Sequence, residues 1–521
     1  MFRNPCLRAD AYTISSEEFA SDAARHTSGY NMVNRYSPTK HMPDLAYDSR
    51  MVMCGLQDWI KDSLLTPVTN EDVRLAGTFM SRAHSFGGYL PFPEMLWKRI
   101  VNDHNGFLPL EISAIPEGST FFPNEPIIQV RNTSPGFGEF AALIEKSLLG
   151  RVSTASACAT LCRHWLERMR EQVRIDLNTM CLPMSSEDID KNARFQIHNF
   201  GARACLTDDE SIILGKAHLL SFHGTDNFDA AYSAWMEGAN HPTGTSIMAL
   251  AHRNVQGHKT EKDAFIAGTE ATKGQSVRIV SLVADCYNYY DAIETICKMA
   301  KENKDVIHVI RPDSGDAYDT LAAIYTACIF HGLFKIVNGW KVPTNVRFIY
   351  GDSVKPKKQF EVMNKLRSIG MLPTQWGIWG VGGYIRNTPN RDIFSSAYKL
   401  CYTADELGVV KLSEDAGKLS IPFWNSVLRR FDGNQQITVH PQHILFTKYE
   451  PQTVINDTVY KNGVADFRRN GSFADIQNRA INDFDKHKMF SFDNPDFGLN
   501  RENLHPAIVE KQDEFYAKYR K

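Results

Sequence analysis

Hydrophobic residues between positions 277 and 384 fall into four short runs, and each run leads directly into a loop of polar residues or glycine. The runs and their loops are Val277–Val283 with Ala284-Asp285, Val306–Ile310 with Arg311–Gly315, Val346–Tyr350 with Gly351–Ser353, and Trp376–Trp379 with Gly380–Gly383. Between the runs, apolar residues recur at the spacing of a helix with one buried face, as at Ile293, Cys297 and Ala300. This alternation predicts parallel strands joined by crossover helices, whose carboxyl-end loops meet at the edge where such folds bind ligands.

Three earlier segments show the same order of an apolar run followed by a polar loop. They are Phe195–His198, Leu219–Phe222 and Ser246–Leu250. Together with the later runs they make seven strand–loop units, close to the eight of an α/β barrel. We therefore predict the α/β fold class, with a TIM-like α/β barrel over residues 191–385.

Short alternating segments outside this region predict a second, β-rich domain. Leu110–Ile115 and Ile127–Val130 are separated by the turn residues Pro116-Glu117-Gly118, and strand-like residues return after Tyr384. We expect residues 1–190, which also contain helical segments, and residues 386–521 to build this domain from both ends of the chain.

The overall composition excludes several classes of function. The 521 residues are 43% hydrophobic and 23% charged with a net charge of −2, as in ordinary globular proteins, and they contain no basic cluster typical of a nucleic-acid binder. No apolar run is long enough to predict a membrane-spanning helix, and the first residues lack the apolar core of a secretion signal. The ten cysteines have no paired spacing, which favours free thiols in a reducing compartment, so we expect a cytoplasmic protein.

The loops after the later runs share a chemistry suited to a phosphorylated sugar. Arg311 supplies a fixed cation for phosphate. Carboxylates that could hold hydroxyl groups and a divalent metal are Asp285, Asp313 and Asp352. The loop Gly380–Gly383 exposes backbone N–H groups to an anion. Each loop alone could be an ordinary turn, but four of them at corresponding strand ends favour a binding site.

The loops after the earlier runs offer groups for an aromatic ligand. Phe200 could stack on a flat ring, and Arg203 could cover the other side of that ring or bind phosphate. Asp226 could accept a hydrogen bond from a ligand amide. His252 could act as a nucleophile toward phosphate, although residues of these types at strand ends are more often structural.

Several of these loops resemble the nicotinate and nicotinamide phosphoribosyltransferase family. The matching runs are His198–Arg203, Phe222–Asp226, Ile310–Gly315, Gly55–Gln57 and Val459–Gly463, within a likeness that extends from about Asp10 to about Phe490. The resemblance implies the fold of a type II phosphoribosyltransferase, a TIM-like barrel with a second β-rich domain. It also implies a pentosyltransferase of NAD salvage that works as a homodimer with shared active sites.

The resemblance further implies roles for individual residues. Those implied around the pyridine base are Phe200, Arg203, Asp226, Ser246, Ser281 and, from the second subunit, Tyr12. Those implied at the ribose and the phosphates are Arg311, Asp313, Gly351, Asp352, Gly382, Gly383, Arg35, Arg391 and Lys399. His252 matches a histidine that ATP phosphorylates in the family, with Asp285 nearby, so that His252, Asp285, Arg311 and Asp313 form the expected catalytic set. Mg²⁺ is the implied cofactor and ATP the implied activator.

The expected reaction is attack of the nicotinamide ring nitrogen on the anomeric carbon of phosphoribosyl pyrophosphate, which gives nicotinamide mononucleotide and pyrophosphate. Asp226 favours the amide over nicotinate. Two residues depart from the family: Ala251 stands where the family has a glutamate, which leaves ATP activation open, and Ala202 replaces an aromatic residue. The alternatives are a nicotinate-specific enzyme, a relative that uses ADP-ribosyl pyrophosphate to make the dinucleotide directly, and a catalytically silent nucleotide-binding relative.

Overall fold

The computed structural model describes residues 3–404, 408–412, 420–430, 436–444, 453–492 and 494–519. The chain forms two compact units. Unit 1 combines Met1–Thr160 with Pro389–Lys521, and unit 2 is Leu161–Thr388, whereas the sequence placed the boundaries after residues 190 and 385. Within the described ranges, no helix is both long and apolar enough to cross a membrane.

Unit 2 is built on a parallel sheet of seven strands in the order β7-β6-β14-β13-β10-β9-β8. The strands are β6 (Ile197–Asn199), β7 (Gly224–Thr225), β8 (Met248–Ala249), β9 (Arg278–Val283), β10 (Val306–Arg311), β13 (Val346–Tyr350) and β14 (Gly377–Val381). A parallel bridge between Gly224 and Thr245, just before β8, connects the two edges of the sheet, so the strands curl into a barrel. The predicted α/β class and TIM-like architecture are confirmed.

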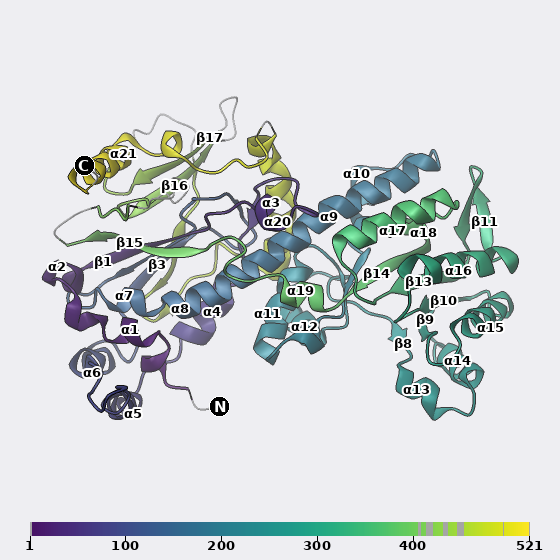
Figure 1. Ribbon diagram of the computed structural model, residues 1–521, viewed down its shortest axis with the longest axis horizontal. Helices are drawn as coiled ribbons and strands as arrows, with labels where there is room; N and C mark the ends of the chain where they lie inside the picture. Colours follow the sequence, from purple (N-terminus) through teal and green to yellow (C-terminus); the bar gives the residue numbers. More distant parts are fainter. Residues whose placement is uncertain are drawn as a thin grey trace. The chain divides into compact units, whose positions relative to one another are not determined.

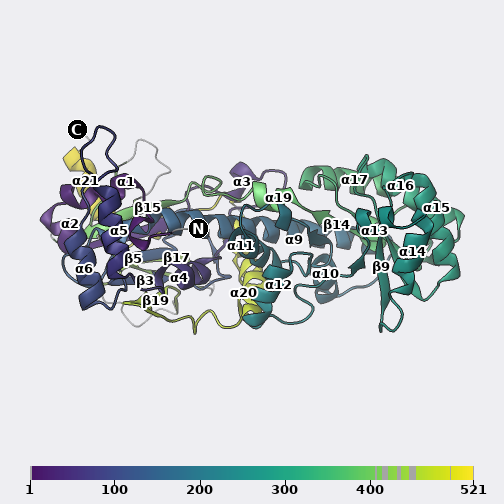
Figure 2. The same cartoon turned by 90° about the horizontal axis from the view of Figure 1, so that it is seen from below.

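The helices that follow the strands of unit 2 lie on the outside of these strands (Figure 1). Their bounds are α11 (Asp208–Leu219), α12 (Phe228–Met236), α13 (His252–Gly257), α14 (Glu261–Glu270), α15 (Tyr289–Glu302), α16 (Ala317–Phe330), α17 (Pro356–Ser368), α18 (Pro373–Trp376) and α19 (Gly383–Asn387). Figure 2 shows α13 to α17 grouped around β9. Helix α15 buries Ile293 and Cys297, as the spacing predicted, and the Asn288 side chain caps its first turn by accepting from two backbone N–H groups. Packing of this apolar face holds the loops at the strand ends in place.

The strand expected at Leu219–Phe222 is wrong. Leu219 is the last residue of α11, and the N–H groups of Ser221 and Phe222 donate to the carbonyl of His218 in the turn that follows. The strand at this place is the two-residue β7. The buried end of a helix and a short buried strand both give a continuous apolar run, so the sequence pattern could not separate them.

Unit 1 contains an antiparallel sheet of six strands in the order β15-β1-β5-β3-β19-β20. The strands are β1 (Ser28–Val33), β3 (Leu110–Ala114), β5 (Ile128–Asn132), β15 (Ala397–Thr403), β19 (Asp457–Lys461) and β20 (Val464–Ala465). Strands from the beginning and the end of the chain therefore pair in one sheet. The predicted β-rich domain made from both ends of the chain is confirmed.

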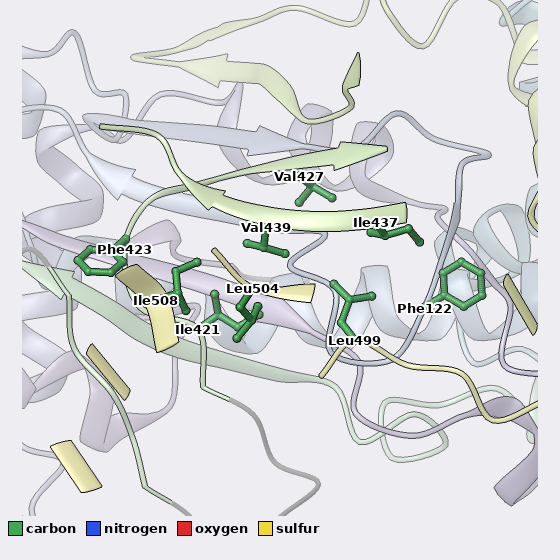
Figure 3. Packing of buried hydrophobic residues seen from close by; sticks show 9 residues of the cluster. All are labelled: Phe122, Ile421, Phe423, Val427, Ile437, Val439, Leu499, Leu504 and Ile508. Atoms are coloured by element: carbon green, nitrogen blue, oxygen red, sulfur yellow. The ribbon is translucent and has the colours of Figure 1, made fainter. Parts of the chain in front are cut away.

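A smaller sheet in unit 1 covers a separate hydrophobic core. Strand β16 (Asn425–Arg430) pairs with β17 (Gln436–Pro441) and β18 (Thr453–Val454), and α21 (Pro506–Tyr519) lies near β17. Figure 3 shows the core side chains pointing toward one another beneath this sheet; they are Phe122, Ile421, Phe423, Val427, Ile437, Val439, Leu499, Leu504 and Ile508. Each fully buried side chain of this kind contributes about 2 kcal/mol to stability, so the core fixes the segments that supply it.

Candidate active site

A cavity of about 300 Å³ lies inside the barrel of unit 2. Its walls include five residues that the sequence singled out, namely Phe200, Asp226, Ser246, Ser281 and Arg311. Parallel strands place their carboxyl ends at one end of a barrel, which explains how residues more than one hundred positions apart line the same cavity. The structure therefore brings together most of the residues expected around the base.

The Phe200 ring lies against backbone that only glycine permits. A Cβ atom at Gly380 would lie 2.2 Å from Cε2 of Phe200, and one at Gly351 would lie 3.5 Å from the same atom. The N–H of Phe200 donates to the carbonyl of Val381 at 2.8 Å, which holds this residue beside the end of β14. The absence of a side chain at Gly380 therefore leaves the space that the ring occupies, whereas a Cβ atom at Gly351 would make only an ordinary contact with it.

The Asp226 carboxylate is held by two neighbours on one of its oxygens. His198 Nε2 lies 2.9 Å from Asp226 Oδ1, and the Ser246 hydroxyl donates to the same oxygen at 2.6 Å. Burial acts to raise the pKa of Asp226, but the hydrogen bonds from His198 and Ser246 and the charge of Arg311 hold it below its ordinary value. Asp226 is therefore an anion whose second oxygen faces no described donor.

Three side-chain atoms of the residues in the cavity wall have no hydrogen-bond partner among the described residues. They are Oε1 of Gln196, the hydroxyl of Ser281, which is 3% exposed, and Nε of Arg311. The other end of the Arg311 side chain is fixed, because its Nη2 donates to the carbonyl of Leu250 at 3.1 Å. Buried polar groups normally have partners, so these three atoms leave unused hydrogen-bonding capacity in the residues that line the cavity.

His252 and Asp285 form a second group at the strand ends. His252 begins α13, its Nε2 lies 3.2 Å from Asp285 Oδ1, and Ser314 donates to the other oxygen of Asp285 at 2.6 Å. The negative charge of Asp285 also acts on Glu261. Burial, and after it this charge, raise the pKa of the Glu261 carboxyl group. The expected pairing of His252 with Asp285 is thus present.

The carboxylates expected at the ribose surround Tyr350. Burial, and after it the negative charges of Asp352, Asp316 and Asp313, raise the pKa of Tyr350 to about 12. Asp316 is already engaged, since it caps α16 by accepting from the N–H groups of two following residues. Asp313 and Asp352 are therefore the two carboxylates near Tyr350 that do not cap a helix.

Eight expected residues of unit 2 lie outside the cavity wall: His252, Asp285, Asp313, Gly351 and Asp352, and the three that follow. Arg203 is exposed in the short helical turn after Phe200. Gly382 and Gly383 begin α19, beyond the end of β14. The cavity lining within the described chain does not include these three.

The expected phosphate contacts from unit 1 form a basic cluster of their own. Lys399 lies opposite Asn31 in the β1–β15 ladder, and the N–H of Arg35 donates to the carbonyl of Phe394. Burial lowers the pKa of Lys399, and so do the positive charges of Lys411, Arg35 and Arg391, against the opposing effect of Glu145. Three residues predicted at phosphates thus lie within one positive field. Tyr12, the fourth expected residue in unit 1, is 72% exposed in α1 (Ala11–Ile14).

The sequence reasoning missed two residues of these groups. His198 precedes Phe200 by two positions, so strand alternation puts both on the face that lines the cavity, and this signal could have identified it. Lys411 joins the basic cluster of unit 1 from a segment with no local pattern that marks it. Within the described residues, no group of three or more His, Cys, Asp or Glu side chains is arranged to hold a metal ion.

Comparisons with known proteins agree with this picture. The profile of the "Nicotinate phosphoribosyltransferase (NAPRTase) family" matches residues 195–413. The nicotinamide phosphoribosyltransferase of Xanthomonas campestris pv. campestris (strain 8004) is 28% identical over 356 residues, covering 66% of this chain and 72% of that protein. The nicotinamide phosphoribosyltransferase of Acinetobacter baylyi is 26% identical over 332 residues, covering 56% of this chain and 61% of that protein.

Solved structures resemble the fold at low identity. Human nicotinic acid phosphoribosyltransferase gives a TM-score of 0.58 at 14% identity, covering 97% of this chain and 99% of that chain. Nicotinate-nucleotide pyrophosphorylase from Pyrococcus furiosus gives 0.57 at 14% identity, covering 93% and 97%. The resemblance seen in the sequence is confirmed: residues 195–413, which hold the barrel strands and their loops, match the model of the nicotinate phosphoribosyltransferase family.

Proposed function

We propose that the protein transfers the phosphoribosyl group of phosphoribosyl pyrophosphate to nicotinamide, giving nicotinamide mononucleotide and pyrophosphate in NAD salvage. The observation that carries this proposal is the Asp226 carboxylate in the barrel cavity, with His198 and Ser246 on one oxygen. The other oxygen can accept from the NH₂ group of an amide. A nicotinate carboxylate there would face a second anion, which disfavours it.

The side chains act mainly by position and charge. The pyridine ring stacks on Phe200, and its amide meets Asp226, which aims the ring nitrogen at the anomeric carbon of the donor. As the new carbon–nitrogen bond forms, the bond to the pyrophosphate oxygen breaks and pyrophosphate leaves with both electrons. Asp313 and Asp352 hold ribose hydroxyls, while Arg311 stabilises the negative charge of the leaving group. Arg35, Arg391 and Lys399 of unit 1 are proposed as further phosphate contacts.

Mg²⁺ is proposed as the cofactor on the basis of the carboxylates near Tyr350. Magnesium sites in phosphate chemistry use only one or two protein carboxylates and complete their coordination with substrate oxygens and water, so a cluster of three protein ligands is not needed. Asp313 and Asp352 fit that role, because both act on Tyr350 and neither caps a helix. The ion would supply positive charge to the pyrophosphate.

The remaining proposals concern ATP and the second subunit. We assign His252, paired with Asp285, as the residue that ATP phosphorylates, and we assign Tyr12 of each subunit to the site of the other in a cytoplasmic homodimer. The shared site is tested by mixing two inactive variants, Tyr12→Ala and Asp313→Ala. Partial recovery of activity in purified heterodimers supports it, and heterodimers as inactive as either parent count against it.

The function itself is tested by comparing substrates. Initial rates are measured with phosphoribosyl pyrophosphate and Mg²⁺ at matched concentrations of nicotinamide and nicotinate. We expect kcat/KM for nicotinamide to exceed that for nicotinate by roughly a hundredfold, as expected when a site must accept one charge state and reject the other. A preference for nicotinate overturns the assignment of Asp226.

A further inference from the structure

Two loops at the carboxyl ends of the barrel strands are joined by a carboxylate that the proposed reaction does not use. We call residues 200–206, which follow β6, the base loop, and Gly380–Gly383, at the end of β14, the glycine loop. Helix α11 begins shortly after the base loop, α19 continues the glycine loop, and the two helices contact each other (Figure 1). The carboxylate is that of Glu210, in the first turn of α11.

The base loop and the glycine loop touch where they leave the sheet. The N–H of Phe200 donates to the carbonyl of Val381, and a Cβ atom at Gly201 would lie 3.0 Å from the carbonyl oxygen of Gly382. The base loop then runs through a short helical turn to Leu206, which is 83% exposed. This outer end lies beyond β6, so strand pairing does not hold it and it needs a separate anchor.

Glu210 supplies this anchor with both of its oxygens. Oε2 accepts a hydrogen bond from the N–H of Leu206 at 2.6 Å, and Oε1 lies 3.2 Å from Nη2 of Arg386 in α19. Arg386 Nη1 also donates to the side chain of Asn387 at 3.4 Å. The side chains of Glu210 and Arg386 are each 27% exposed, so water screens their attraction only in part. One carboxylate therefore connects the outer end of the base loop to the helix that continues the glycine loop.

The simplest role for Glu210 would be to cap α11, but its contacts go beyond capping. Thr207 stands three residues before Glu210, the sequence signature of a capping box, and the Thr207 hydroxyl oxygen accepts from the N–H of Glu210 at 3.1 Å. In a capping box the glutamate would accept in return from the N–H of Thr207. Here it accepts from the N–H of the preceding residue, Leu206, and its second oxygen meets Arg386. Capping alone explains neither contact.

We propose that Glu210 is a positioning residue that fixes the base loop relative to the glycine loop. This inference rests on the proposed transfer reaction, in which Phe200 of the base loop stacks on the pyridine ring and the glycine loop holds phosphate of the donor. The ring nitrogen reaches the anomeric carbon only if the two loops present base and donor at a fixed separation. Glu210 acts through the backbone of Leu206 and the side chain of Arg386, not on either substrate.

Steady-state kinetics separates positioning from a simple effect of charge. A carboxylate near bound phosphates repels them, so loss of its charge alone would lower KM for the donor. Loss of the anchor would instead loosen both loops. We expect Glu210→Ala, which breaks both contacts, to raise KM for phosphoribosyl pyrophosphate and for nicotinamide about tenfold each, with a smaller change in kcat. Arg386→Ala should raise both about threefold, and Arg386→Lys, which keeps the charge, should stay within about twofold of the wild type.

Hydrogen exchange of the ligand-free chain tests the link without any reaction. Arg386→Ala breaks the ion pair from the side of the glycine loop. If Glu210 couples the loops, the backbone N–H of Leu206 in the base loop should then exchange about threefold faster. The matched control is Asp188→Ala, because Asp188 occupies the same position in the first turn of α10 (Ser186–Ala193) and caps it through Ser185, with no bond to either loop among the described residues. This variant should change neither the exchange at Leu206 nor the two KM values.

Two results overturn the proposal: exchange at Leu206 that is unchanged in Arg386→Ala, or a donor KM that is unchanged or lower in Glu210→Ala. The variant that combines both substitutions should be no more impaired than Glu210→Ala alone, since both break the same link. Fully additive effects on KM would therefore also contradict the proposal. If the wild type makes no mononucleotide from nicotinamide, the proposed function fails, while the exchange result still decides whether Glu210 links the two loops.

Discussion

The imidazole of His198, in β6, and the carboxylate of Asp226, which directly follows the neighbouring strand β7, lie 2.9 Å apart. His198 pairs with Gly224 in the ladder, where a Cβ atom would lie 2.6 Å from His198 Nδ1, so the ring is confined on that side. The pair therefore fixes both the position and the charge of the one carboxylate in the cavity wall. Three predictions concern this cavity.

Substitution of Asp226 should change the choice of base. Asp226→Asn removes the negative charge but keeps the size of the side chain, so repulsion of a nicotinate carboxylate is relieved. We expect the ratio of kcat/KM for nicotinamide to that for nicotinate to fall roughly tenfold or more. Steady-state kinetics with both bases measures this ratio. An unchanged ratio would show that Asp226 does not determine the choice between the two bases.

Loss of His198 should weaken binding of the base more than it slows turnover. His198→Ala leaves Asp226 with Ser246 as its one described side-chain donor, so the carboxylate is less well held. We expect KM for nicotinamide to rise about tenfold with a smaller change in kcat. The control is His331→Ala, which breaks a similar pair with Glu294, 2.8 Å long, on the outer helices. Equal kinetic effects in the two variants would show that His198 has only a structural role.

Addition of one methyl group beside Phe200 should damage the base site. The Cβ atom of Gly380→Ala would lie 2.2 Å from the ring, which must then move off its position. We expect KM for nicotinamide to rise at least roughly tenfold, with folding retained by circular dichroism. Gly150→Ala is the control, because a Cβ atom there meets nothing within 4 Å. Normal kinetics in Gly380→Ala would contradict the proposed stacking on Phe200.

Acid should destabilise unit 2 through a buried histidine. Burial lowers the pKa of His218 from 6.5 to about 4, so this residue is neutral in the folded protein and takes up a proton on unfolding between these two values. The unfolded state binds more protons in that range, so the free energy of unfolding falls as pH drops below 6.5, by about 3 kcal/mol at pH 4. Urea titrations between pH 7 and 4 measure this slope. His218→Leu should make it shallower, and an unchanged slope would exclude His218 as its source.

The sequence predicted much of unit 2 because its physical signals are local. Buried parallel strands give short apolar runs, and polar loops such as Arg311–Gly315 follow them directly, so both the barrel and most of its site could be recognised. The strand predicted at Leu219–Phe222 was wrong because the signal is local: the buried end of a helix gives the same short apolar run as a buried strand. Pairing of His198 with Asp226 depends on which strands are neighbours, which the apolar pattern alone does not determine.

The cavity of about 800 Å³ in unit 1, whose lining includes Arg35, Lys411 and Arg501, could not be predicted in this way. Its lining comes from separate stretches of chain, none of which carries a recognisable motif, and its charge becomes evident only when Arg35, Lys411 and Arg501 line the same space. The burial of Gln512 is equally a result of tertiary packing. Long-range packing, which has no short-range pattern, sets both features.

The central claim is tested most directly by the mass of the product. The full chain is incubated with Mg²⁺, nicotinamide and phosphoribosyl pyrophosphate, with and without ATP, and the mixture is analysed by mass spectrometry, with Asp313→Ala as the inactive control. We predict nicotinamide mononucleotide and pyrophosphate in equal amounts, with a higher yield in the presence of ATP if His252 is phosphorylated. Formation of no mononucleotide from nicotinamide, while nicotinate or ADP-ribosyl pyrophosphate is turned over, would contradict the account.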